Sequence, residues 1–165
     1  MRAFRLVGDS FVAEFEPDEA KLIIEVAEQM AQLITDRDAA QIVDPALLRL
    51  LPDAYPDDPE ATAEFRRFTA DSLAERKIHN ARVVAACMAT AAVTPAASPE
   101  TICFVTISPA EAQSWLRCLT DMRLTIAARL GIENYDDLPI DNPPLVELYD
   151  WLGFVQASLV DVLPL

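Results

Sequence analysis

The chain has 165 residues, of which 52% are hydrophobic and 24% are charged, a composition typical of one globular domain with its own core. We therefore expect a single domain over residues 1–165. Its 27 acidic residues outnumber its 13 basic residues, giving a formal net charge of −14, which argues against binding to nucleic acid or to an anionic membrane surface.

Two apolar-rich runs open the chain, Phe4–Val7 and Phe11–Phe15, and the intervening Gly8-Asp9-Ser10 predicts a β-hairpin. Pro17, followed by two acidic residues, is typical of the first turn of a helix. The helix it predicts is amphipathic, because apolar residues recur on one face at Ile23, Ala27, Met30 and Ile34.

Two aspartate–proline pairs mark further helix starts. Asp44-Pro45 predicts a short helix over 46–51, and Asp58-Pro59 predicts a helix that runs through Phe65 and Phe68. A kink near Thr69 would separate this helix from an alanine-rich one over 73–92, which buries Val84 and Met88.

The second half of the chain contains one further predicted strand and two further predicted helices. Residues 101–107 (TICFVTI) are typical of a buried strand. Ser108 to Glu111 forms a capping-box motif with proline at the first helical position, and Gly131 is typical of that helix's end. Its apolar stripe consists of Ala112, Trp115, Leu119, Met122 and Ile126. Asn142-Pro143 predicts a last helix running to about Leu163.

These elements predict an α+β, mainly helical fold. The hairpin and the strand over 101–107 are expected to form a small three-stranded antiparallel sheet, packed against five or six helices. The three cysteines, Cys87, Cys103 and Cys118, show no close spacing, so we expect free thiols in a reducing compartment. The first ten residues lack a signal-peptide pattern, and the longest nearly apolar run, Val83–Val93, is too short to span a bilayer. The sequence therefore predicts a cytoplasmic protein.

The residue types that carry catalysis are scarce. The sequence contains no GxSxG turn and no glycine-rich phosphate loop, and three glycines are too few for a dinucleotide fold. His79 is the only histidine, and Glu75 one turn before it would supply at most a second metal ligand. We therefore predict no catalytic residue, no metal and no cofactor.

Basic residues gather between positions 62 and 82. They are Arg66, Arg67, Arg76, Lys77 and Arg82. This segment is a candidate docking face for a partner or an anion; the alternative is pairing with the acidic C-terminal part of the same chain. Arg123 lies between Leu119 and Ile126 on an apolar stripe, where either a structural ion pair or a bound anion would compensate its charge.

The last helix is apolar on most of its circumference. Its stripe runs from Leu145 to Val162, and Glu147, Asp150, Ser158 and Asp161 form a narrow polar strip. Such a helix is either central to the core or part of an interface, including that of a homodimer. Gly153 would allow another backbone to approach closely. The interface candidates are Trp151, Leu152, Phe154, Val155 and Leu159.

Short segments spread over almost the whole chain are similar to one known family. In chain order they are Leu50–Tyr55, Asp57–Glu60, Glu64–Arg67, Lys77 with Asn80-Ala81, Trp115-Leu116 with Asp121, Arg123-Leu124, Arg129–Gly131 and Leu148–Gly153. They resemble the actinobacterial family called domain of unknown function twenty-seventeen, which includes AosR-like oxidative-stress regulators and is associated with the ClpS proteolysis adaptor. The resemblance implies a regulator that contacts a protein partner, either a sigma factor or a proteolysis adaptor. The redox role in that family relies on an N-terminal cysteine pair, whereas Arg2 to Phe15 contain no cysteine here.

We therefore predict a non-enzymatic regulatory domain that binds a protein in stress response, proteolysis or transcription control. The alternative is a small-anion-binding or enzymatic domain in which Arg66, Arg67, Arg123 and His79 line one pocket.

Overall fold

The computed structural model describes residues 1–37, 44–52, 60, 71–92, 102–132 and 142–163. In chain order these residues form β1 (Arg2–Val7), β2 (Ser10–Phe15), α1 (Pro17–Thr35), α2 (Pro45–Leu50), α4 (Asp71–Ala92), β3 (Cys103–Ile107), α5 (Pro109–Leu130) and α6 (Pro143–Val160). The predicted mainly helical α+β fold is confirmed. The helix expected to begin at Pro59 lies outside the described residues.

The three strands form one antiparallel sheet in the order β1-β2-β3, as predicted. Gly8 and Asp9 make the hairpin turn, and Gly8 has a φ of 61°, a left-handed conformation that glycine adopts without steric cost. The pairing between β1 and β2 shifts by one residue between Arg2 and Arg5. This irregularity places both arginines on the same face as Glu14, with nitrogen–oxygen distances of 3.1 and 3.6 Å.

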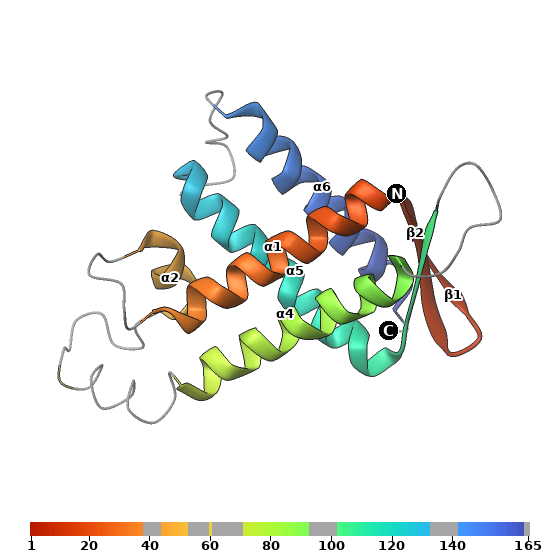
Figure 1. Ribbon diagram of the computed structural model, residues 1–165, viewed down its shortest axis with the longest axis horizontal. Helices are drawn as coiled ribbons and strands as arrows, with labels where there is room; N and C mark the ends of the chain where they lie inside the picture. The colour runs from red at the N-terminus through yellow and green to blue at the C-terminus, as the bar shows by residue number, and fades with distance from the viewer. Residues whose placement is uncertain (38–43, 53–59, 61–70, 93–101, 133–141, 164–165) are drawn as a thin grey trace.

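The sheet stands at one end of the molecule, and the helices extend from one side of it (Figure 1). Its buried face carries alternate residues of β2 and β3: Phe11, Ala13, Phe15, Cys103, Val105 and Ile107. Trp115 of α5 packs edge-on against Phe4 at a centroid distance of 5.7 Å, and its ring lies 6.4 Å from that of Phe15. This aromatic group joins the sheet to the helical core.

Local chemistry explains where the helices begin. Proline occupies the first turn of α1, α2, α5 and α6, where its missing N–H has no helical partner to lose. The predicted capping box of α5 is present, with the Ser108 and Glu111 side chains each accepting a hydrogen bond from the other's backbone N–H. Gly131 ends α5 in the left-handed conformation, also as predicted.

The apolar stripes predicted for α1 and α5 are buried throughout, and so are Val84 and Met88 of α4. Two expectations for α6 were wrong. The helix ends at Val160, three residues early, and Ser158 is buried instead of lying on the polar strip, because its hydroxyl donates to the Val155 carbonyl oxygen at 2.8 Å. Over the described residues, every helix is too short or too polar to cross a lipid bilayer.

Candidate partner-binding surface

Helix α4 packs against both α1 and α5 (Figure 1). One ion pair links it to each of these two parts of the fold. At its first turn the Asp71 carboxylate contacts the Arg37 guanidinium, which follows α1, at 2.6 Å. One and a half turns later the Lys77 ammonium reaches Asp121 of α5 at 2.5 Å. These two contacts and the buried Ala81, Val84 and Met88 set which face of α4 is turned to solvent.

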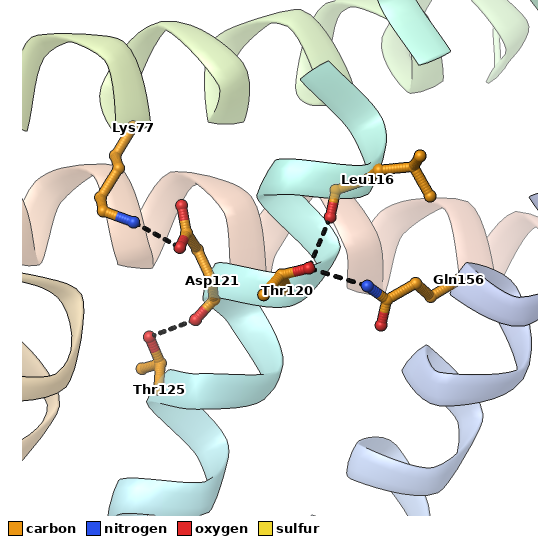
Figure 2. A network of polar contacts seen from close by, with 6 residues as sticks. All are labelled: Lys77, Leu116, Thr120, Asp121, Thr125 and Gln156. Atoms are coloured by element: carbon orange, nitrogen blue, oxygen red, sulfur yellow. Dashed lines mark hydrogen bonds and ion pairs between the residues drawn. The ribbon is translucent and has the colours of Figure 1, made fainter. Parts of the chain in front are cut away.

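The Lys77–Asp121 pair is shielded from water, with side-chain exposures of only 15% and 6% (Figure 2). Burial raises the pKa of the Asp121 carboxyl, and the nearby Lys77 ammonium opposes that rise. Lys77, a candidate for partner binding, is thus already paired within the chain. Its partner is on α5, not in the acidic C-terminal part that the sequence suggested.

The remaining basic residues of α4 face outward. Arg76 and Arg82 are exposed, and within the described residues neither takes part in an ion pair or a hydrogen bond. His79 lies between them on the same face. Towards the end of the helix this face continues as uncharged small residues. We call this surface the α4 face; it consists of Glu75, Arg76, His79, Arg82, Ala86, Ala89 and Thr90, all exposed.

A groove flanks the α4 face on each side. One groove, of about 550 Å³, runs between α1 and α4 and is lined largely by alanines, with Glu28 and Arg82 among its polar residues. The other, of about 490 Å³, lies between α4 and β3 and is bordered by Phe104, Cys87 and Glu111. Ala86 lines both grooves, so it marks the ridge between them. Alanine side chains keep this ridge low, which allows another helix to approach closely.

Arg123 is held in the contact between α5 and α6. Its guanidinium lies 4.4 Å from the centre of the Tyr149 ring, and one terminal nitrogen donates to Gln156 Oε1 at 3.2 Å. Gln156 in turn donates to Thr120, and Thr120 donates to the Leu116 carbonyl oxygen, as Figure 2 shows. Among the described residues no carboxylate pairs with Arg123, and its buried Nε has no hydrogen-bond partner. The expected ion pair is therefore not formed there.

Gly153 provides the space for this arginine. A Cβ atom at that position would lie 3.3 Å from Arg123 Cζ, closer than an ordinary van der Waals contact. The close approach that we expected at Gly153 therefore exists, but the group that approaches is a guanidinium and not a second backbone.

The pocket that the sequence suggested is not formed by its described residues. Of the four residues expected to line it, the structure describes Arg123, which is directed into the α5–α6 contact, and His79, which is exposed on the outer face of α4. Arg66 and Arg67 lie outside the described residues. No group of three metal-ligating side chains is found in the described part of the chain.

The interface candidates on α6 divide between core and surface. Leu152, Val155 and Leu159 are fully buried within the chain, and Trp151 is half-buried against Phe15. Phe154 is exposed, at 51%. It belongs to an outward surface that we call the α6 face, made of Glu147, Asp150, Phe154, Ala157, Val160 and Asp161, all exposed.

All three cysteines are free thiols. Cys103 and Cys118 are buried, as expected of small core residues, whereas Cys87 is partly exposed at the groove between α4 and β3. Burial raises the pKa of the Cys87 thiol, and the adjacent Glu111 carboxylate, whose Oε1 lies 3.7 Å from the sulfur, raises it further. The thiol is therefore protonated at neutral pH and a weak nucleophile.

Sequence reasoning missed the two grooves and the roles of Asp121 and Gln156. Asp121 had a usable signal, because it follows the buried Cys118 by three residues and must share part of its face. A carboxylate at such a position requires a buried cation, and Lys77 satisfies it from a helix 44 residues away. Nothing in the sequence indicated which lysine or arginine that would be.

These features define a mainly helical α+β fold in which a basic helix face lies between two grooves. Comparison with known proteins shows its family. The family model described as "Domain of unknown function (DUF2017)" matches residues 1–163, so the chain belongs to that family. It is similar to the oxidative stress regulator AosR of Mycobacterium tuberculosis (strain ATCC 25618 / H37Rv), with 28% identity covering 94% of this chain and 83% of the relative. The putative oxidative stress regulator AosR of Mycobacterium leprae (strain TN) is 32% identical over 71% of this chain and 57% of its own length. No solved structure matches the chain.

Proposed function

We propose that this chain is a non-enzymatic regulator that acts by binding another protein through the α4 face. One observation carries the proposal: in a chain of net charge −14, Arg76 and Arg82 are exposed and unpaired within the described residues, beside an uncharged ridge flanked by two grooves.

Each part of the α4 face suits a protein partner. Exposed guanidinium groups form directional, charge-assisted hydrogen bonds with carboxylates, and arginine is enriched in protein interfaces. The alanine ridge allows a partner's backbone to come close, and the grooves can take its larger apolar side chains. A surface of this kind needs no catalytic group.

The names of the relatives supply the biological setting. Because they are called oxidative stress regulators, we propose that this chain also regulates a response to oxidants. The family resemblance implies two partner classes, a sigma factor and a proteolysis adaptor, and either can be tested as a purified protein.

The proposal is tested by complementation. A strain that lacks the gene is given the wild-type chain, the double variant Arg82→Glu/Ala86→Glu or the control Arg117→Glu, which changes another exposed arginine, on α5. We expect the wild type and the control to restore survival in hydrogen peroxide, and the double variant to fail at equal abundance. Full survival with the double variant would exclude the α4 face, and no rescue by the wild type would exclude the role in oxidative stress.

Direct binding is tested by photo-crosslinking in the same cells. A photoreactive amino acid at position 86 should give a discrete crosslinked product, whereas the same group at the exposed hairpin residue Asp9 should not. The product at position 86 should disappear when Arg82→Glu is added. Equal crosslinking at both positions would indicate non-specific contact and overturn the proposed surface.

A further inference from the structure

The α6 face has the chemistry that the α4 face would recognise. It presents three carboxylates, those of Glu147, Asp150 and Asp161, and none of them forms an ion pair within the described residues. Between them Phe154 and Val160 are 51% and 52% exposed, so the α6 face combines carboxylates with large apolar side chains. We propose that the α6 face of one copy of this chain binds the α4 face of a second copy.

The net charges of the two faces are opposite. On α4, Arg76 and Arg82 outnumber the one carboxylate of the face, Glu75, and are followed towards the C-terminus by the small residues Ala86 and Ala89. On α6, Glu147 and Asp150 are followed in the same direction by the apolar Phe154 and Val160. Opposite charges therefore meet, and apolar residues meet the alanine ridge, when the two helices run parallel.

The spacing along the two helices also agrees. Ala86 and Ala89 follow Arg82 by four and seven residues, and Phe154 and Ala157 follow Asp150 by the same numbers. Both spacings keep the residues on one face of a helix.

The shapes are complementary in the same register. Phe154 and Val160 project from α6, whereas Ala86 and Ala89 leave the surface of α4 low between its two grooves. A protruding side chain beside a low ridge is the arrangement by which one helix packs its ridges into the grooves of another. Exposed apolar area on both helices would be removed from water together.

This contact joins two different surfaces, so it forms a dimer or a larger ring when the rotation between copies closes, and an open chain when it does not. The proposed self-association rests on the proposed function in one respect, because both require an accessible α4 face. Self-association would cover that face and so block another partner. A pair of single-helix faces is smaller than a standard protein interface, so the association is weak and reversible.

Charge exchange between the two faces tests the proposal. The α4 variant Arg76→Glu/Arg82→Glu and the α6 variant Glu147→Arg/Asp150→Arg are studied by sedimentation equilibrium, alone and mixed in equal amounts. We expect each variant alone to associate at least tenfold more weakly than the wild type, and the mixture to recover wild-type association. Arg117→Glu should behave as the wild type does.

Net charge alone predicts a different result. The α4 variant has a net charge of −14 − 4 = −18 and the α6 variant one of −14 + 4 = −10, so repulsion between copies decreases only in the second. Stronger self-association of the α6 variant, or a mixture that stays monomeric, would overturn the proposal. So would a wild-type chain that is monomeric at every concentration. If self-association fails this test but complementation still depends on Arg82 and Ala86, the proposed function stands. If the double variant of these two residues complements normally, the proposed function is wrong, and the test of self-association is unaffected.

Discussion

The buried pair of Lys77 and Asp121 provides a quantitative test of the structure. In the variant Lys77→Met the Asp121 carboxylate keeps its buried position, with a side-chain exposure of 6%, but loses its cation. Breaking a buried ion pair by removing one partner typically costs about 3–5 kcal/mol. Because domains of this kind have unfolding free energies of about 5–15 kcal/mol, we expect the variant to lose a large part of its stability.

The assay is urea unfolding followed by circular dichroism at 222 nm at pH 7. Lys21→Met is the matched control, because Lys21 pairs with Glu25 at the surface with side-chain exposures of 73% and 50%. That change should lower the unfolding free energy by no more than about 0.5 kcal/mol. The double variant Lys77→Met/Asp121→Leu removes both charges and should be far closer in stability to the wild type than Lys77→Met is.

The pH dependence supplies an independent check. Burial raises the pKa of Asp121 in the folded state above its ordinary value of 3.8, so folding favours the protonated carboxyl. That contribution to stability is fully present below the unfolded-state pKa and is lost as the pH rises through the folded-state pKa. Removing the Lys77 ammonium raises the folded-state pKa further, so Lys77→Met should be less destabilised at pH 5 than at pH 7. A loss below about 1 kcal/mol at pH 7, or the same loss at both pH values, would refute the buried pair.

Three further predictions concern other contacts. A glycine-to-alanine change in a helix ordinarily raises the unfolding free energy by roughly 1 kcal/mol, but Gly153→Ala should raise it hardly at all, because the new Cβ displaces the Arg123 guanidinium. Urea unfolding should show the full gain when the same change is made in an Arg123→Ala background. A maleimide reagent should label Cys87 first and slowly in the native protein, since the other two thiols are buried and its own pKa is raised; mass spectrometry that finds another cysteine labelled first would contradict this. Ser108→Ala should lower the unfolding free energy by about 1 kcal/mol through loss of the α5 cap, and an unchanged denaturation midpoint would exclude that role.

Features that depend only on neighbours along the chain could be predicted from the sequence. Gly8-Asp9 specifies the hairpin because glycine adopts the left-handed turn conformation without steric cost. Pro17 and Ser108-Pro109 specify helix starts because caps act within a single turn. The 3.6-residue period of apolar residues identified the buried stripes of α1 and α5 for the same reason.

The tertiary structure decided which charges are satisfied and which remain available. Lys77 and Arg76 are adjacent in the sequence, yet one is paired with Asp121 and the other faces solvent, because a helix turns successive side chains by about 100°. Only the packing of α4 against α1 and α5 fixes which of the two directions is inside. The division of α6 into buried Leu152 and exposed Phe154 arose in the same way. A partner-binding surface consists of the residues that packing leaves exposed to solvent. No local sequence pattern therefore specifies such a surface.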